Sequence, residues 1–326
     1  MGPDPVPGHP AAPPLLLLGV RRSGTTLLRV MLDRSSELAI PDESYFVPQL
    51  AHHHRRRVDP AAFLDDLRRI RRLQDWGIRA DDVAPRLRAG MTAGEAISAV
   101  FETLAAAQGK RRWGDKTPLY MQHLRLLERL FPDALYVHLV RDGRDAALSY
   151  LSVPPGIMTE GWGHPRDAAG FACQWRTEVE AARRLGRRVG SARYLETSYE
   201  DLVADPEAAL RRICAFAGLP WEEQLLGYVG EVDLSDKPHQ QRLAQPPTPG
   251  VRNWRSEMRA QDVEAFEAVA GDLLRELGYE VRSHRAGGLG ARVRLARYRA
   301  VSAAWRATGV AVQRSPLWRR RHPPLA

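Results

Sequence analysis

Cysteine is scarce in this chain of 326 residues: there are two, Cys173 and Cys214, and their spacing is not that of metal ligands. This usage suits a reduced, cytosolic protein, and we expect no metal site. No apolar run approaches the ~20 residues that a bilayer-spanning helix requires. Residues 1–13 lack the basic start and the apolar run of a signal peptide, so we interpret them as a disordered leader.

Acidic residues are missing from the end of the chain. The whole sequence has 48 Lys and Arg against 39 Asp and Glu, a formal net charge of +9. Residues 285–326 hold ten Arg and no acid, which leaves 38 basic and 39 acidic residues in the other 284. The basic charge therefore belongs to a C-terminal extension, the body at 14–284 is nearly neutral, and we expect no nucleic-acid partner.

The basic extension has an amphipathic pattern. On a helical projection, one side carries Tyr298, Val301, Trp305 and Val312, and the other carries Arg292, Arg299 and Arg306. This pattern allows two interpretations: peripheral contact with an anionic membrane surface, or a helix packed on the body with its arginines in water.

The stretch Leu15–Thr26 predicts a strand, a tight turn and a helix. Four leucines after Pro13-Pro14 are typical of a parallel strand buried on both faces. The helix that follows the turn offers backbone N–H groups and the positive end of its dipole, which together bind anions. The candidate ligands are Arg21, Arg22, Ser23, Gly24, Thr25 and Thr26.

The two glycines of this turn have the spacing of a phosphate-binding P-loop, Gly19-x4-Gly24. The next position is Thr25, where nucleotide kinases carry the lysine that reaches the β- and γ-phosphates. The absence of that lysine argues against ordinary nucleoside-triphosphate chemistry. From this stretch alone, an ordinary strand-to-helix turn is the alternative.

A second unit of the same kind starts at Ala134–Val140. The predicted strand ends at Arg141-Asp142-Gly143, and the helix that follows carries Ser149. An arginine at a strand end and a serine two turns into the next helix suit one phosphate between them, whereas the alternative is a surface Arg–Asp network. The two units together predict two anion subsites on one sheet.

Several other segments complete the predicted organisation. Glu37–Ile40 predicts a short strand that leads into the carboxylate-bearing loop 41–46, and ligands collect at such carboxyl ends. We interpret residues 113–118 as a turn, His52–Arg57 as a solvated face, and 59–110 as a helical insert over the sheet. Further elements are predicted as helices at 166–185, 206–217 and 261–277 and as a strand at 192–197.

Four stretches in this order resemble the sulfotransferase family that uses 3′-phosphoadenosine-5′-phosphosulfate (PAPS). Arg22-Ser-Gly-Thr-Thr26 resembles the 5′-phosphosulfate loop of that family, and Val140-Arg-Asp-Gly-Arg144 with Ser149 resembles its 3′-phosphate site. The segment from Tyr199-Glu-Asp-Leu202 to Gly218-Leu-Pro-Trp221 resembles the part whose tyrosine lies near the adenine. Val251-Arg-Asn-Trp-Arg255 has the place of a late basic loop over the cofactor.

Within the family, the first loop, Pro41-Asp-Glu43 and Gly114-Asp-Lys-Thr-Pro118 are most similar to the tyrosylprotein sulfotransferase-like branch. The resemblance implies a P-loop-like three-layer α/β fold with a central, mostly parallel sheet flanked by helices. It also implies transfer of a sulfuryl group from PAPS to an acceptor hydroxyl, with 3′,5′-ADP as the product.

The resemblance also assigns roles to residues. Glu43 would be the general base, and Lys116 and Arg22 would assist transfer. The implied cofactor contacts are the first-loop residues 21–26, Arg141, Ser149, Tyr199, Arg252, Asn253, Trp254 and Arg255. Two departures are visible: Val153 stands where the branch has another basic contact, and the late loop lacks the family's glycine-rich closure.

Two other functions remain as alternatives. A P-loop nucleotide kinase is disfavoured by Thr25 and by the lack of a clear magnesium-binding acid at a strand end. A non-enzymatic, basic membrane-associated protein rests on the tail alone. The acceptor stays open among a tyrosine peptide, a sugar or glycolipid and a specialised-metabolite hydroxyl. The Ala/Arg-rich composition suggests a bacterial, cytoplasmic enzyme and favours a small molecule or glycolipid.

Overall fold

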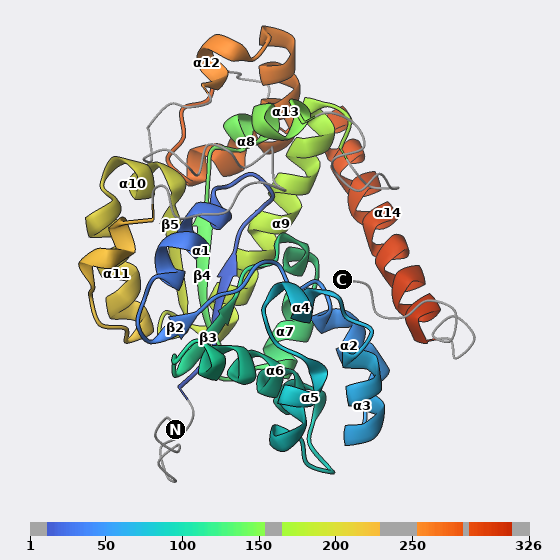
Figure 1. Ribbon diagram of the computed structural model, residues 1–326. Coiled ribbons are helices and arrows are strands. Elements are labelled where there is room, and N and C mark those ends of the chain that lie inside the picture. Colours follow the sequence, from blue (N-terminus) through green and yellow to red (C-terminus); the bar gives the residue numbers. More distant parts are fainter. Residues whose placement is uncertain (1–11, 154–164, 229–252, 283–286, 315–326) are drawn as a thin grey trace.

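The computed structural model describes residues 12–153, 165–228, 253–282 and 287–314, and its centre is a five-stranded sheet (Figure 1). The order is β2-β3-β1-β4-β5, and every neighbouring pair is parallel. The strands are β1 Leu15–Leu18, β2 Leu38–Ala39, β3 Arg112–Asp115, β4 Leu135–Val140 and β5 Tyr194–Ser198. The predicted parallel α/β sheet is therefore confirmed.

The four leucines of β1 divide between the two faces of the sheet. Leu16 and Leu18 belong to one hydrophobic core and Leu15 and Leu17 to the other. Successive side chains of a strand point to opposite faces, so this split requires a layer of helices on each side. β1 lies between β3 and β4, which brings the loops that follow these three strands to one edge.

Helices cover both faces of the sheet (Figure 1). One core contains residues of α1, α10 and α11, whereas the larger core contains residues of α2, α6, α7, α8, α9 and α13. Their bounds are α1 Thr25–Asp33, α2 Val47–His53, α6 Ala93–Ala107, η2 Pro118–Gln122, α7 Leu124–Leu130, α8 Gly143–Leu151, α9 Ala168–Val189, α10 Tyr199–Ala204, α11 Pro206–Ala217, η3 Glu223–Leu226, α12 Trp254–Glu257 and α13 Ala260–Glu276. The expected three-layer arrangement is confirmed.

The prediction of a turn at 113–118 was wrong, because Arg112–Asp115 forms β3. Glycine and aspartate are poor strand formers, but burial between two neighbouring strands outweighs that preference. A Cβ atom on Gly114 would lie 2.6 Å from the carbonyl oxygen of Leu15, so the close approach of β1 requires glycine here.

The region 59–110 contains α3 Pro60–Leu67, α4 Arg72–Asp75, α5 Ala80–Val83 and η1 Ala84–Arg86 as well as α6. The solvated face predicted at 52–57 was wrong for two histidines. His53 Nδ1 and His54 Nε2 lie 2.9 and 3.0 Å from Asp66 Oδ2, and both rings are largely buried. Asp66 thus joins α2 to α3.

The basic extension forms a 26-residue helix, α14 Leu289–Arg314, that packs along α9, α2 and α13 (Figure 1). Leu295 is buried, and Arg299 pairs with Glu180 of α9 at 2.6 Å. Val301 and Trp305 remain 48% and 56% exposed. Membrane contact of this helix stays a prediction. Among the described helices, none is both long and apolar enough to cross a bilayer.

Candidate active site

The loops after β1 and β4 meet at the carboxyl edge of the sheet. The Arg22 guanidinium donates from Nε to Ser149 Oγ over 3.0 Å, and Arg141 Nη1 donates to the carbonyl oxygen of Arg22 over 3.2 Å. The two strand–loop–helix units therefore form one continuous region. It lies where the chain leaves the central strand, the place where open α/β sheets bind ligands.

The first loop has the backbone of an anion cradle. Arg22 and Gly24 have φ values of 70° and 88°, and α1 begins directly after them. No side chain caps this helix N-terminus, and the Ser23 hydroxyl is buried without a hydrogen-bond partner among the described residues. A Cβ atom on Gly24 would lie 2.3 Å from the Tyr199 ring, so glycine is required here. The loop thus offers N–H and hydroxyl groups to an anion.

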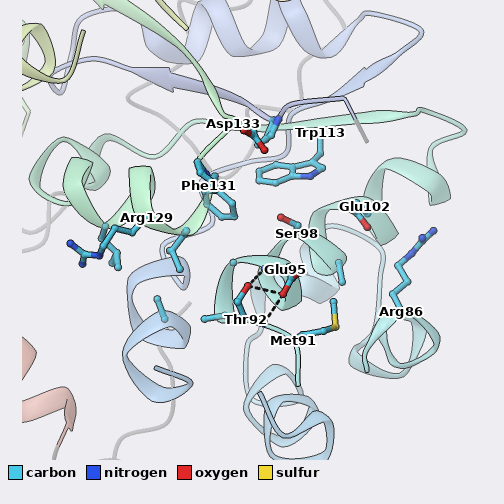
Figure 2. A pocket seen from close by; sticks show the side chains of 18 of the residues that line it. Arg86, Met91, Thr92, Glu95, Ser98, Glu102, Trp113, Arg129, Phe131 and Asp133 are labelled. Carbon is cyan, nitrogen blue, oxygen red and sulfur yellow. Dashed lines mark hydrogen bonds between the residues drawn. The ribbon is translucent and has the colours of Figure 1, made fainter. Parts of the chain in front are cut away.

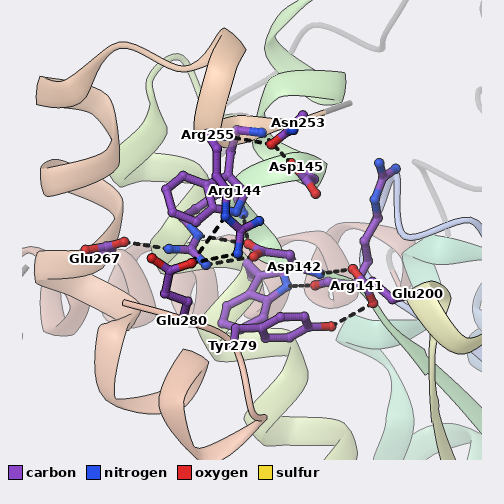
Figure 3. A network of polar contacts seen from close by, with 12 residues as sticks. Arg141, Asp142, Arg144, Asp145, Glu200, Asn253, Arg255, Glu267, Tyr279 and Glu280 are labelled. Atoms are coloured by element: carbon purple, nitrogen blue, oxygen red, sulfur yellow. Dashed lines mark hydrogen bonds and ion pairs between the residues drawn. The ribbon is translucent and has the colours of Figure 1, made fainter. Parts of the chain in front are cut away.

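The second subsite is built around Arg141, which is only 7% exposed. Its guanidinium lies 4.4 Å from the centroid of the Tyr199 ring, and its Nε has no hydrogen-bond partner among the described residues. Figure 3 shows Arg141 extending away from Glu200 and Asp142. A buried guanidinium with a free N–H suits an anionic ligand.

Glu43 and Lys116 lie together at the adjoining strand end. Lys116 Nζ is 2.5 Å from Glu43 Oε1 and 3.1 Å from Thr26 Oγ1, and the Tyr45 hydroxyl also donates to Glu43. β2 lies beside β3, which explains why the loop after one strand reaches the lysine that follows the other. The structure therefore gathers a carboxylate, an ammonium and the first-loop threonine.

The ion pair affects the acidity of both groups. Burial alone would raise the pKa of Glu43, but the charge and hydrogen bond of Lys116 outweigh it, so the pKa lies below its ordinary value. Burial lowers the pKa of Lys116, and Glu43 opposes that shift. We attribute the low pKa of Glu43 to its cationic partner, so the carboxylate is ionised and able to accept a proton at neutral pH.

A buried network that the sequence interpretation missed fixes the Glu43 loop. Ser44 donates from its hydroxyl to Asp115 Oδ2 over 2.6 Å and from its backbone N–H to Thr117 Oγ1 over 3.0 Å, and it also contacts the Tyr120 hydroxyl. Burial raises the pKa of Asp115 to about 6 despite these hydrogen bonds. The signal in the sequence was the position of Asp115, directly before Lys116 and at the end of an unrecognised strand.

The late segment has partners of its own (Figure 3). Asn253 Oδ1 caps α12 through the Arg255 N–H at 3.0 Å, and the Arg255 guanidinium pairs with Glu280 at 2.8 Å. Trp254 is 1% exposed and packs under Arg144, whose guanidinium carbon lies 3.6 Å from a Trp254 ring centroid. Arg252 lies outside the described residues. Cofactor contact by these four residues stays a prediction.

Arg144 holds this part of the molecule together. Its guanidinium is fully buried and pairs with Asp142 at 2.7 Å and with Glu267 of α13 at 2.5 Å. The neighbouring Asp145 accepts a hydrogen bond from the backbone N–H of Trp254 at 2.7 Å. Figure 3 shows Arg144 of α8 between Asp142 and Glu267 of α13. We interpret the cluster as structural, since it ties the helix after β4 to the late segment.

A cavity of about 1270 Å³ lies at the other end of the sheet (Figure 2). Its lining includes Pro13 before β1, Trp113 in β3 and Phe131 before β4. It contains none of the residues predicted to act on a substrate, and it lies at the amino ends of the strands. Across the described residues, no group of three or more His, Cys, Asp or Glu has a metal-binding arrangement.

Comparison with known proteins defines the class of this chain. Residues 13–223 match the Sulfotransferase family, and the chain belongs to that family. The predicted family resemblance is therefore confirmed, and transfer of a sulfuryl group is the chemistry that the family name denotes.

Curated relatives include the expected tyrosylprotein branch. Protein-tyrosine sulfotransferase A of Caenorhabditis elegans is 27% identical over 277 residues, which cover 82% of this chain and 68% of that protein. Protein-tyrosine sulfotransferase 2 of Gallus gallus is 30% identical over 230 residues, covering 68% and 57%. Nodulation protein NoeE of Sinorhizobium fredii is 29% identical over 303 residues, covering 81% and 65%. The chain thus spans less than two thirds of the last two relatives.

Solved structures agree on the fold. The sulfotransferase domain of the olefin synthase from Synechococcus PCC 7002 is 27% identical with a TM-score of 0.57, over 83% of this chain and 96% of that domain. The sulfotransferase domain from the Curacin biosynthetic pathway is 20% identical with a TM-score of 0.54, over 83% and 99%. The second likeness supports the fold alone.

Proposed function

We propose that this protein transfers a sulfuryl group from PAPS to an acceptor hydroxyl, with Glu43 as the general base. The observation that carries the proposal is the contact of Glu43, Lys116 and Thr26 beside the first anion loop. A base, a cation and a sulfuryl-binding loop in one place are what this transfer needs.

The residues present suit PAPS as the donor. The first loop, with the unpartnered Ser23 hydroxyl, would hold the 5′-phosphosulfate, and Arg141 with Ser149 would hold the 3′-phosphate. Thr25 replaces the lysine that a γ-phosphate needs, and PAPS has no γ-phosphate. When bound, PAPS supplies the activated sulfuryl group and a 3′,5′-ADP leaving group.

The side chains at the site would then have separate roles in sulfuryl transfer. Glu43 accepts the proton of the acceptor hydroxyl, for which its ionised state prepares it. Lys116 Nζ and the Arg22 guanidinium donate hydrogen bonds where negative charge develops on the leaving side. The Ser44–Asp115 network holds the base loop in register with Lys116.

A nucleotide-binding measurement tests the second subsite. We expect Arg141→Ala to weaken 3′,5′-ADP binding at least tenfold and to leave ADP binding almost unchanged. The reason is that a charge-assisted hydrogen bond to phosphate contributes ~1.5–3 kcal/mol, and only 3′,5′-ADP has the 3′-phosphate. Isothermal calorimetry with both nucleotides measures the difference.

Arg259→Ala is the matched control, because Arg259 is exposed and pairs only locally with Asp262. It should bind both nucleotides like the wild type. Equal losses for ADP and 3′,5′-ADP in Arg141→Ala would contradict the assignment of a 3′-phosphate site.

A further inference from the structure

A cleft of about 1080 Å³ lies between α14 and the body of the protein. Tyr298, Trp305 and Arg306 of α14 form one wall. The opposite wall comes from α9, η2 and α7, and Arg21 of the first anion loop also lines the cleft. Among the sequence-predicted site residues, Arg21 is the one that reaches it.

Chain connections place this cleft beside the transfer site. Arg21 directly precedes Arg22, and its charge acts on both Tyr45 and Tyr150. η2, which supplies Gln122 to the cleft, begins two residues after Lys116. α2, which supplies His52, follows the Glu43 loop. Three parts of the cleft lining, Arg21, η2 and α2, therefore continue from the first anion loop, the Lys116 segment and the Glu43 loop.

Glu178 of α9 is an unexplained polar group in this cleft. It is 5% exposed, its Oε1 accepts from Gln174 Nε2 at 3.0 Å, and no hydrogen bond reaches its Oε2 among the described residues. Burial raises the pKa of Glu178 to about 7, although Gln174, Arg21 and Gln122 each favour the ionised form. A buried carboxylate oxygen without a partner is costly unless a ligand supplies a donor.

The charge of the cleft limits what that donor can be. Glu178 is the one acid among the lining residues that the structure describes. Six arginines line the cleft, Arg21, Arg125, Arg129, Arg184, Arg188 and Arg306, and two of them, Arg184 and Arg188, pair with Glu180 and Glu128 outside the lining. This excess repels a cationic acceptor, so an ammonium group is a poor match for Glu178. Neutral donors, such as hydroxyl and amide groups, are therefore the better match for Glu178.

The rest of the cleft suits a ring with several hydroxyls. Gln122 and Gln174 add polar groups near Glu178, and His123 also lines the cleft. Burial lowers the pKa of His123 to about 4, so this imidazole is neutral at pH 7. On the α14 wall, Trp305 leaves 56% of its surface exposed, which offers a flat apolar face. Several polar groups and one exposed aromatic side chain in a single cleft favour a polyhydroxylated ring over a single phenol.

We propose that this cleft binds the acceptor and that the acceptor is a saccharide, with its ring on Trp305 and its hydroxyls on Glu178 and the neighbouring amides. The proposal rests on the proposed sulfotransferase function and names its substrate class. The family match covers residues 13–223, whereas the α14 wall is formed by Leu289–Arg314. The contacts proposed for Trp305 therefore lie outside the part of the chain that matches the family.

Binding on a printed array tests the substrate class. The probe is the fluorescently labelled full-length protein with saturating 3′,5′-ADP, on a surface carrying glycans and tyrosine-containing peptides. We expect binding to a subset of glycans, lost in Trp305→Ala and retained in Val293→Ala, which removes an equally exposed apolar residue of α14 outside the cleft.

Kinetics with a bound glycan as acceptor tests Glu178. We expect Glu178→Gln to raise the KM for the acceptor about tenfold with little change in kcat, because hydrogen bonds to a charged group are stronger than those to an amide. Glu264→Gln, an exposed acid on α13, is the matched control.

Three results would overturn the inference: binding to peptides alone, binding to no glycan, or glycan binding that Trp305→Ala leaves intact. Calorimetry with 3′,5′-ADP separates this failure from that of the proposed function. If the nucleotide binds and glycans do not, the saccharide assignment is wrong. If the nucleotide does not bind either, the sulfotransferase proposal is wrong as well.

Discussion

Glu43→Gln is expected to slow single-turnover sulfate transfer by about 10²–10⁴-fold, the usual contribution of a positioned general base. The substitution keeps the shape of the side chain and removes its basicity. Affinity for 3′,5′-ADP should change little, because Glu43 faces Lys116 and Tyr45 rather than the phosphate subsites. Rapid-quench measurement beside calorimetry separates the two effects.

Asp42→Asn is the control for Glu43, since the neighbouring acid pairs with Arg29 at 2.9 Å, whereas Glu43 pairs with Lys116. It should cost far less than Glu43→Gln. A Glu43→Gln variant that transfers sulfate at nearly the wild-type rate would show that the base lies elsewhere.

The pH dependence of the wild-type enzyme follows from the same ion pair. The Lys116 ammonium holds the pKa of Glu43 below its ordinary value, so the base stays ionised at mildly acidic pH. The active, ionised form is lost only as pH falls through that lowered pKa. The acid limb of the kcat/KM profile should therefore lie below the range usual for glutamate, and a limb near pH 7 would contradict the assignment.

Arg144→Leu is expected to destabilise the protein by about 3–5 kcal/mol, the usual cost of removing one partner from a buried ion pair. The substitution removes the cation that pairs with buried Asp142 and Glu267, and it also removes the group that packs on Trp254. Urea unfolding followed by circular dichroism measures the change.

An exposed ion pair nearby supplies the control for Arg144. Arg255→Ala breaks the ion pair between Arg255 and Glu280, two side chains that are both about half exposed. It should lower the free energy of unfolding by no more than about 1 kcal/mol. Adding Glu267→Leu to Arg144→Leu should recover part of the loss, because it removes a buried carboxylate that pairs with Arg144 in the wild type. Similar midpoints for Arg144→Leu and Arg255→Ala would contradict a structural role for the cluster.

Much of the fold could be predicted because its signals are local. The four leucines of β1 and the helix predicted at 206–217, which is α11, lie where the sequence predicts them. β3 was missed because Trp113-Gly114-Asp115 gains its strand conformation from neighbours more than 70 residues away. The pairing of His53 and His54 with Asp66 was missed because it depends on how α2 packs against α3, although the residues are only 13 and 12 positions apart in the sequence.

The part of the candidate site that lies in loops at the carboxyl ends of strands could be predicted from the sequence. Arg141 follows β4 directly, and Arg22 and Glu43 lie in the loops after β1 and β2, whose carboxyl ends meet at one edge of the parallel sheet. The Glu43–Lys116 contact depends on the order of β2 and β3, which no local pattern encodes. Trp254 packs against Arg144, and Arg255 pairs with Glu280; the motif at 251–255 does not encode either contact.

Calorimetric titration of the wild-type protein with 3′,5′-ADP and, separately, with ATP–Mg²⁺ tests the central claim most directly. The two anion subsites and the absence of a P-loop lysine at Thr25 predict clear binding of 3′,5′-ADP, with little or none of ATP–Mg²⁺. Tight ATP–Mg²⁺ binding without affinity for 3′,5′-ADP would contradict the account.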